Sequence, residues 1–400
     1  MSASQARQVT AKKDAVWSLL NEARSMIPTL RAREQEAEER RSVHPETIAQ
    51  MRKNDLFKVL QPVRYGGLGG DLVDFVELAI ELGRGSGSAA WIHGNVCLHS
   101  WIIGMFPAAA QDEIWKDPNT IVSSCLRPAG IAERVNGGFK IKGRWPYVSG
   151  CDHTDWTILG AMIPKEDGTK EPAYLLVPKS DYQIIDEWFV TGLAATGSKD
   201  LVIEDGFVPE HRIMTAATAN SCSSPGVGIH KHPIYSVPLF SSFSFFIAAP
   251  IVGMAVGAIE QYTDYVKSRA TAGGATGGGE IMATLPTIQL RVGEAQMRAD
   301  AAAAVLLRAA ALTMEGAGEI TVDRRIANRR AHSMSTQLAV EAIDQLNEAT
   351  GASGILTADP TQRAWRNIHA GAKHFSLNWD AIRTMCGQYS LGIDPKLRMF

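Results

Sequence analysis

The sequence predicts an α+β fold: an N-terminal α-helical domain, a middle β-barrel domain and a C-terminal four-helix bundle. Three observations predict it. Apolar residues keep helical spacing up to about residue 115, short strands with turn residues follow from about 120, and long helical segments fill the chain from about 235. The 400 residues suit two to three domains. We place the domains at 1–119, 120–230 and 231–400.

The first of these domains is expected to be helical throughout. Ala15, Leu19 and Ala23 recur at helical spacing, and Pro45 suits the first turn of a further helix. A glycine-rich run lies between helices at 65–70. Because no strand precedes this run, it does not form a dinucleotide-binding fingerprint. The apolar stretch that contains His99 is the last long helix of this part.

The second domain is predicted from short β-type segments. Ile121–Leu126 is typical of a strand, and turn signals follow at Asn136-Gly137 and Asp167-Gly168. About 95 residues of short strands at such spacing are typical of a small barrel or sandwich. Of these two, we predict a β-barrel.

The third domain is expected to be a bundle of long helices. One segment, 237–259, carries no charge and is long enough to span a bilayer. It also contains Pro238 and Pro250, so we interpret it as a helix buried inside a bundle. Gly253 and Gly257 would permit close helix packing. The candidate helices are 239–268, 286–315, 322–350 and 361–390.

Composition narrows the class of protein. The formal net charge is −2, from 40 Lys and Arg against 42 Asp and Glu, so no basic excess points to nucleic acid. The N-terminus lacks an apolar signal region, and we expect no membrane association. No pair of cysteines has CxxC spacing, which argues against a disulfide framework or a metal site. We therefore expect a cytoplasmic protein. The cysteines are Cys97, Cys125, Cys151, Cys222 and Cys386.

Three motifs in order resemble the acyl-CoA dehydrogenase superfamily over nearly the whole chain. Residues 62–69 read PVRYGGLG, 137–150 read GGFKIKGRWPYVSG, and 207–210 read FVPE. In that superfamily a glutamate near the last helix abstracts a proton from a thioester. Residues 370–376 read AGAKHFS, so His374 stands where the glutamate is expected.

With that departure, the chain more closely resembles the two-component, group D flavin-dependent monooxygenases built on the same fold. This family includes hydroxylases of 4-hydroxyphenylacetate, steroid phenols and indoles. Similar stretches are YVSGCDH at 147–153, TGSKDL at 196–201 and WRNIHAGAKH at 365–374. The resemblance implies a small aromatic substrate of phenol or indole type. It also implies reduced FMN or FAD, O2 and a flavin C4a-hydroperoxide. A separate NAD(P)H:flavin reductase would supply the flavin, and relatives form homotetramers.

Three residues are the expected catalytic groups under this resemblance. Ser149, on the strand facing the flavin, would hydrogen-bond flavin N5, although it could instead satisfy the turn at Gly150. His374, on the last helix, would exchange a proton with the substrate hydroxyl or the peroxide. His99 would contact the substrate hydroxyl, although it could be a buried structural histidine.

Other residues are expected to bind rather than react. Arg269 resembles an arginine that meets the cofactor phosphates of a neighbouring subunit, and Thr350-Gly351 resembles a loop that approaches the flavin. Turn or surface roles are the alternative for these positions. The expected substrate-binding residues are Ser124, Cys125, Trp91 and His369. The expected cofactor-binding residues are Tyr147, Ser149, Thr196, Ser198, Arg269, Thr350 and Gly351.

Two other functions remain open at this level. An acyl-CoA dehydrogenase-like flavin dehydrogenase or oxidase would need a carboxylate at the flavin and would retain it tightly. A non-catalytic helical scaffold would need no flavin at all. Phenol and indole substrates both fit the sequence, because indole is already nucleophilic and needs less acid–base help.

Overall fold

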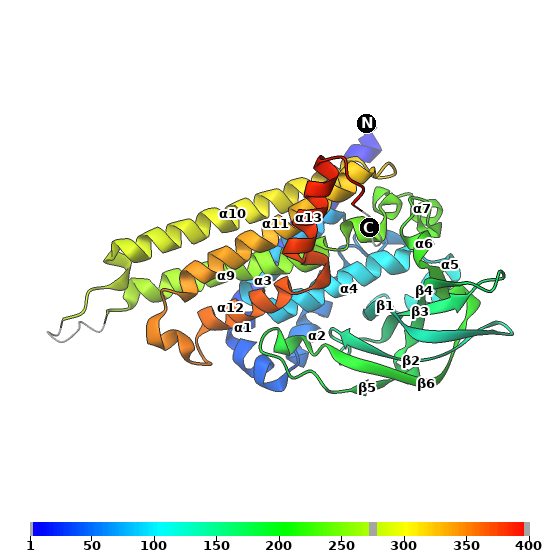
Figure 1. Cartoon of the computed structure of the whole chain (residues 1–400), viewed down its shortest axis with the longest axis horizontal. Helices are drawn as coiled ribbons and strands as arrows, with labels where there is room; N and C mark the ends of the chain where they lie inside the picture. The colour runs from blue at the N-terminus through cyan, green and yellow to red at the C-terminus, as the bar shows by residue number, and fades with distance from the viewer. Residues whose placement is uncertain (1–2, 272–277, 396–400) are drawn as a thin grey trace.

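Helices, one sheet and further helices follow one another along the chain (Figure 1). The computed structural model describes residues 3–271 and 278–395. The helices before the sheet are α1 (Ala3–Arg40), α2 (Pro45–Lys53), α3 (Leu72–Gly85), α4 (Gly87–Met105) and α5 (Ala108–Ile114). The strands are β1 (Val122–Val135), β2 (Gly138–Val148), β3 (Trp156–Pro164), β4 (Lys170–Pro178), β5 (Gln183–Ile185), β6 (Lys199–Pro209) and β7 (Ile213–Thr215). The later helices are α6 (Ala216–Ala219), α7 (Pro225–His230), α8 (Leu239–Ser242), α9 (Phe245–Ser268), α10 (Pro286–Glu315), α11 (Val322–Asn347), α12 (Pro360–Ala372) and α13 (Trp379–Ser390).

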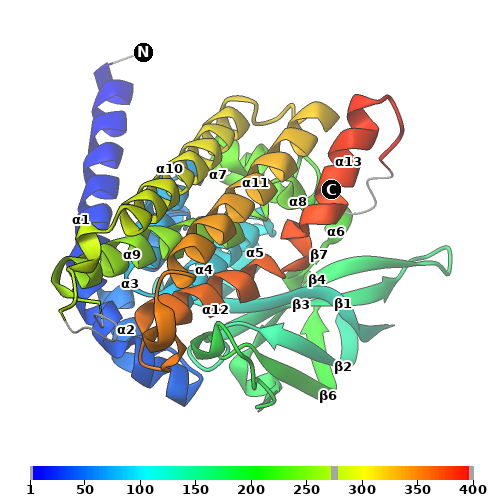
Figure 2. The ribbon, with the colours of Figure 1, turned by 60° about the vertical axis from the view of Figure 1, so that its left-hand side comes forward.

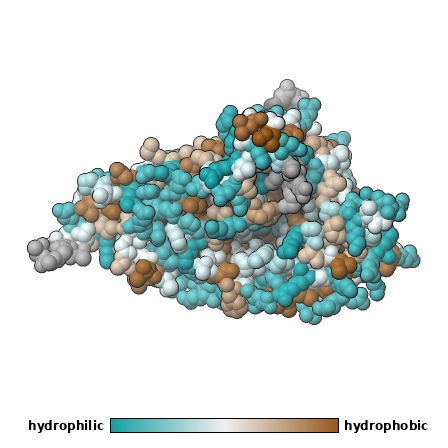
Figure 3. Space-filling model, in the orientation of Figure 1, coloured by the Kyte–Doolittle hydropathy of each residue, from teal (hydrophilic) through white to brown (hydrophobic). Residues whose placement is uncertain are grey.

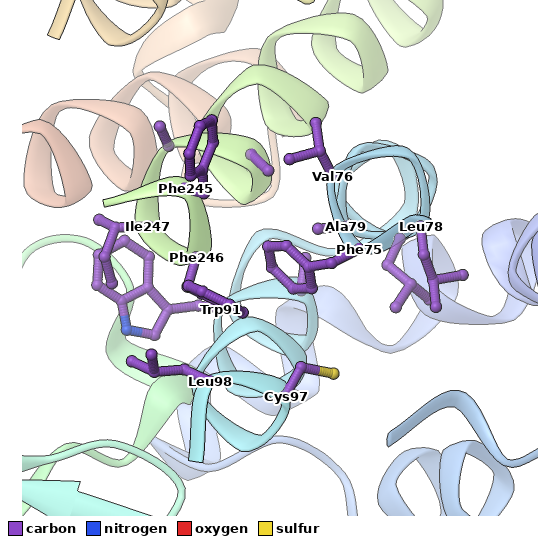
Figure 4. Close-up of a cluster of buried hydrophobic side chains, with 14 of the residues drawn as sticks. Phe75, Val76, Leu78, Ala79, Trp91, Cys97, Leu98, Phe245, Phe246 and Ile247 are labelled. Atoms are coloured by element: carbon purple, nitrogen blue, oxygen red, sulfur yellow. The ribbon is translucent and has the colours of Figure 1, made fainter. Parts of the chain in front are cut away.

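The helix α4 runs through the interior and carries several site residues. It begins after Ser86, whose extended backbone breaks the chain away from α3 and whose Oγ accepts a hydrogen bond from the Ala89 N–H at 3.2 Å. Its apolar residues contact α3 and α9 at once, as the close-up shows (Figure 4). Phe246 of α9 packs on Phe75 of α3 with ring centroids 4.3 Å apart. A helix enclosed in this way has a fixed position relative to its neighbours.

The strands form one seven-stranded sheet in the order β5-β6-β2-β1-β3-β4-β7. Because β5 and β7 lie at opposite ends of this order, the described strands form one open sheet in the place where we predicted the middle β domain. The central strand β1 pairs antiparallel with β2 and parallel with β3. The strand that we predicted at Ile121–Leu126 continues past Pro128 to Val135. The pairing of β1 with β3 changes register on both sides of Pro128, which keeps the strand continuous at this residue.

The helices α10, α11 and α12 pack around α9, and α13 packs on α11 (Figure 2). Two of the four predicted helices are each divided. The 239–268 segment breaks between α8 and α9, and the 361–390 segment breaks between α12 and α13. The second break arises because Asn378 caps a new helix by accepting a hydrogen bond from the Ala381 N–H at 2.9 Å. The non-helical residues between α12 and α13 include His374.

The uncharged segment is core, as expected. One helical stretch of the described residues, Leu239–Ser268, is long and apolar enough to cross a membrane, and 94% of its most apolar window is buried. On the face in Figure 3, hydrophobic residues are scattered among hydrophilic ones. Gly253 packs so closely that a Cβ there would lie 2.4 Å from the Ile80 carbonyl oxygen. The small residues of α9 therefore serve helix packing, as predicted.

Candidate active site

The site begins where α4 meets the end of β2. Trp91 Nε1–H donates to Ser149 Oγ at 3.2 Å. Ser149 lies one residue beyond β2, in a turn, rather than on the strand as we expected. The turn is possible because Gly150 adopts a φ of +72°, which favours glycine, and it packs against Ile92 of α4. The turn thus places the Ser149 hydroxyl against the Trp91 indole.

A chain of hydroxyl groups leads inward from Ser149 and has only one possible direction. Thr196 Oγ1 donates its single proton to the Leu193 carbonyl at 2.8 Å, because a carbonyl can only accept. Ser198 must therefore donate to Thr196 at 2.7 Å, and Ser149 must donate to Ser198 at 2.8 Å. Ser149 also accepts from Trp91. One lone pair on Ser149 Oγ remains for a ligand that donates a hydrogen bond.

The positions of Thr196 and Ser198 make them supports for Ser149. Both are buried, with exposed fractions of 1% and 4%, whereas Ser149 is half-buried. The segment that carries them is docked on α12, because the Leu193 N–H donates to Asn367 Oδ1 at 2.7 Å. We predicted direct cofactor contacts for both residues. In the structure both side chains are buried, and they connect to Ser149 through the hydrogen bonds of Ser198.

His374 lies beside Trp91, with ring centroids 6.3 Å apart. We predicted His374 on a helix. The structure instead places it just before the 3₁₀ turn Phe375–Leu377. Its Nδ1 accepts from the Ser376 backbone N–H at 3.3 Å and lies 2.8 Å from Ser376 Oγ. Since Nδ1 is an acceptor, neutral His374 carries its proton on Nε2.

The surroundings of His374 keep it neutral. Burial, together with the smaller effect of the nearby Arg329 guanidinium, lowers the pKa of His374 from 6.5 to about 4. Phe243 stacks on the ring, with centroids 5.7 Å apart. At neutral pH the group is therefore a hydrogen-bond donor through Nε2, not a cation.

His99 and Ser124 form a second pair with the opposite polarity. His99 Nδ1 lies 2.5 Å from the Val122 carbonyl, so Nδ1 carries the proton. Its Nε2 lone pair then accepts from Ser124 Oγ at 2.7 Å. Burial lowers the pKa of His99 to about 4, although its bond to the Val122 carbonyl opposes this shift. The Ser124 oxygen can still accept a hydrogen bond from a donor group of a ligand.

The strand geometry separates Ser124 from Cys125, both of which we expected to bind the substrate. Successive side chains of β1 point to opposite faces of the sheet. Ser124 faces α4, whereas Cys125 packs against the apolar cluster of the sheet. Burial also raises the pKa of the Cys125 thiol, so it stays protonated. The structure therefore gives Ser124, and not Cys125, a place beside His99.

Two other predicted residues lie apart from these pairs. His369 Nε2 is 2.8 Å from Asp344 Oδ1, and its ring packs on Trp365. His369 therefore contacts Asp344 and Trp365, whereas His374 contacts Trp91, Phe243 and Ser376. Tyr147 is 70% exposed, has a φ of +63°, and meets Trp188 edge to face. An exposed ring on strained backbone suits a ligand-facing role for Tyr147.

Arg269, Thr350 and Gly351 form a separate group at the end of α9. Arg269 lies over the Tyr265 ring at 5.9 Å, and Tyr265 Oη lies 3.3 Å from Ser353 Oγ. Ser353 in turn donates to the Thr350 carbonyl at 2.9 Å. Figure 1 shows this end of α9 away from the sheet. Among the described residues, no hydrogen bond or ring contact joins this group to Ser149.

Sequence reasoning missed the polar groups that support His374. Arg329 of α11 is 3% exposed and donates to Ser244 Oγ at 2.8 Å. Ser244 Oγ lies 3.5 Å from the Ser376 carbonyl, so the buried guanidinium is linked to the His374 turn. The spacing of Ser376 two residues after His374 is a readable turn signal. Arg329 gives no such signal, because arginines on helices usually face solvent.

A cavity of about 260 Å³ lies between α1, α3, α9 and α12. Its lining includes Glu34, whose pKa is raised mainly by burial, and Arg363. None of the predicted site residues lines it. The chemistry of Trp91, Ser149, His374 and His99 therefore lies elsewhere.

Comparison with known proteins adds family information. Models of the acyl-CoA dehydrogenase N-terminal and C-terminal domains match residues 19–118 and 245–379. The chain is 39% identical over 388 residues to the oxygenase component of the FADH2-dependent resorcinol hydroxylase of Rhizobium sp. (strain MTP-10005). That match covers 94% of this chain and 95% of the relative.

Two solved structures are similar over nearly their whole length. The HsaA monooxygenase from M. tuberculosis has a TM-score of 0.87 and 32% identity, covering 95% of this chain and 98% of the other. XiaF from Streptomyces sp., in complex with FADH2 and glycerol, has a TM-score of 0.87 and 25% identity, covering 100% of both chains.

Proposed function

Because this chain belongs to the acyl-CoA dehydrogenase family and, within it, to the flavin-dependent monooxygenases, we propose that the residues around Trp91 bind reduced flavin beside a phenol. The protein is the oxygenase component of a two-component enzyme that hydroxylates a small aromatic compound. The phenolic assignment rests on one observation: His99 and His374 are neutral and held in opposite tautomers.

The residues at Ser149 fit a reduced flavin. Reduced flavin carries a hydrogen on N5 and is a donor there, whereas oxidised flavin accepts at N5. Ser149 keeps one lone pair and has committed its own proton to Ser198. When bound, reduced flavin with O2 supplies the oxygen atom that is transferred. The names of two similar proteins specify FADH2, so we propose reduced FAD as the first flavin to test.

His99 and Ser124 would handle the substrate proton. A phenol hydroxyl placed at Ser124 donates to Oγ, while the Ser124 proton is already directed at His99 Nε2. The pKa of His99 is about 4, so it is a weak base at rest. The substrate hydroxyl becomes strongly acidic only as its ring carbon bonds to oxygen, and the proton then passes through Ser124 to His99.

His374 has the complementary role in this proposal. We expected His374 to exchange a proton with the substrate hydroxyl or the peroxide, and its Nδ1 is already occupied by Ser376. Its Nε2–H instead donates a hydrogen bond to oxygen at the flavin edge. The Trp91 and Phe243 rings cover part of the His374 ring and leave it half-buried, so water competes less for such a bond. The acid and base functions are thus divided between two histidines.

The assembly around the site is also part of the proposal. A separate reductase supplies the flavin, consistent with the words "oxygenase component" in the relatives' names. We propose a cytoplasmic homotetramer, in which Arg269 and Thr350-Gly351 meet the flavin of a neighbouring subunit. The separation of this group from Ser149 within one chain supports that arrangement.

A coupled assay tests the function. The protein is combined with a generic flavin reductase, NADH, FAD and either phenols or indole, and hydroxylated product is counted against NADH consumed. We expect product with phenols, and more hydrogen peroxide per product in Ser149→Ala than in the natural protein. Absence of hydroxylated phenol under every flavin condition would refute the assignment.

A further inference from the structure

Asn95 interrupts a helix that is otherwise enclosed. All other residues of α4, from Gly87 to Met105, are buried, whereas Asn95 is half-exposed. It lies one turn after Trp91 and one turn before His99, on the same stripe of the helix. Solvent-accessible surface therefore reaches the middle of α4 between two residues of the proposed site.

The other faces of α4 are covered by protein. Gly94 packs so closely that a Cβ there would lie 2.4 Å from the Phe246 carbonyl oxygen. His93 Nε2 bonds to the Leu56 carbonyl at 2.9 Å on a further face. The stripe with Asn95 faces the turn at Ser149 and the strand at Ser124, through its neighbours Trp91 and His99.

The orientation of the Asn95 amide is fixed by its backbone contact. Nδ2 donates to the Trp91 carbonyl at 2.8 Å, and a carbonyl can only accept. The amide oxygen, Oδ1, is therefore directed away from that carbonyl. At this half-buried position it is an acceptor for a ligand that carries a hydrogen-bond donor.

We propose that Asn95 determines substrate specificity by accepting a hydrogen bond from a second hydroxyl on the aromatic ring. This inference rests on the proposed phenol hydroxylation. One helical turn, about 5.4 Å of rise, separates Asn95 from His99. Because Ser124 bonds to His99, one turn from Asn95, we expect the two acceptors to suit hydroxyls set apart on the ring, as in a 1,3- or 1,4-dihydroxybenzene, with one at Ser124 and one at Asn95. We expect adjacent hydroxyls, as in 1,2-dihydroxybenzene, to reach only one of them.

The test is equilibrium binding of 1,3-dihydroxybenzene and of phenol to the full chain with reduced flavin in the absence of O2. In the natural protein we expect the 1,3-diol to bind roughly tenfold more tightly than phenol, or about 1.4 kcal/mol, and the 1,2-diol to show no such advantage. In Asn95→Leu the ratio of the two Kd values should fall to within about twofold.

A matched control is Ser100→Ala. Ser100 is buried on the same helix and its Oγ donates to the Val96 carbonyl at 3.1 Å, so this change also removes a bond to the preceding turn. It should leave the ratio unaltered. Asn95→Ala gives the same readout if Asn95→Leu does not fold.

Each outcome of this test is decisive. An unchanged ratio in folded Asn95→Leu or Asn95→Ala refutes the role of Asn95 while leaving phenol hydroxylation intact. A natural protein that neither binds nor hydroxylates phenol or the diols refutes the proposed function together with this inference. Loss of diol preference confined to the Asn95 variants supports the inference.

Discussion

Replacing Thr196 by valine should weaken the preference of the protein for reduced over oxidised flavin. Thr196 fixes the direction of the hydroxyl chain because its proton is held by the Leu193 carbonyl. Without it, Ser198 can donate to Ser149, and Ser149 can turn its own proton toward the flavin. Oxidised flavin, which accepts at N5, would then gain one hydrogen bond that the natural protein denies it.

The magnitude follows from one net hydrogen bond. Such a bond contributes about 1 kcal/mol, with a range of about 0.5–1.5 kcal/mol, which corresponds to a change of up to roughly tenfold in Kd. We therefore expect the ratio of Kd values for oxidised and reduced FAD to fall about five- to tenfold in Thr196→Val. The fall should come mainly from tighter binding of the oxidised form. Titration calorimetry with each redox form, under anaerobic conditions for the reduced one, measures this ratio.

The control separates the polarity of the chain from general destabilisation. Thr336→Val also removes a buried hydroxyl that donates to a backbone carbonyl, at 2.9 Å, but on α11 and away from Ser149. Both variants should unfold at a slightly lower temperature, because each removes one buried hydrogen bond to a backbone carbonyl. Only Thr196→Val should change the ratio. An unchanged ratio in folded Thr196→Val would show that the hydroxyl chain does not select the redox state.

Three further predictions concern the histidines and the core. His99→Ala should lower kcat/KM for phenols by about 100-fold and for indole much less, since indole needs no hydroxyl deprotonation, and equal losses would contradict the proton path. His374, with a pKa lowered from 6.5 to about 4, binds protons more weakly in the folded than in the unfolded protein. Its contribution to stability is therefore present above about pH 6.5 and is lost as pH falls toward 4. In His374→Gln the calorimetric Tm should therefore fall less steeply with decreasing pH than in the natural protein. Identical Tm–pH profiles for the two proteins would rule this out. Gly253→Ala places a methyl 2.4 Å from the Ile80 carbonyl and should cost about 1–3 kcal/mol in denaturant unfolding, whereas Gly293→Ala, with open space around it, should cost nothing.

The order of elements was predictable because it depends on local patterns. Helical spacing and turn residues are properties of neighbouring residues, so the change from helices to strands and back was correct. Whether the sheet closes was not predictable, because closure depends on whether β5 pairs with β7, which are distant in sequence. Strand pairing of this kind leaves little trace in local composition.

The site was predictable by residue type more than by geometry. The resemblance indicated His99, Ser124 and Ser149, and the structure brings each to the face of α4 or to a direct partner of it. The sequence predicts a helix for His374 because this residue falls within the candidate helix 361–390. The capping residue Asn378 and the serine at 376 mark the break, and they could have been read as helix punctuation. The tautomers of the histidines depend on which backbone carbonyl or N–H lies opposite, which no sequence pattern specifies.

The direction of the hydroxyl chain could not have been read from the sequence. It depends on the single fact that Thr196 faces the Leu193 carbonyl rather than an N–H. The buried Arg329 was missed for a similar reason: its helix carries several arginines, and only packing decides which one is enclosed.

The Trp91–Ser149 contact joins residues that are 58 positions apart, and His374 reaches the same tryptophan from almost the far end of the chain. Contacts of such sequence separation close long loops, so they form more slowly than the local contacts within a helix. A partly folded chain with its helices intact would therefore have no means of handling flavin and oxygen. During refolding, recovery of product formation should lag behind recovery of helical circular dichroism and should coincide with docking of the sheet on α4.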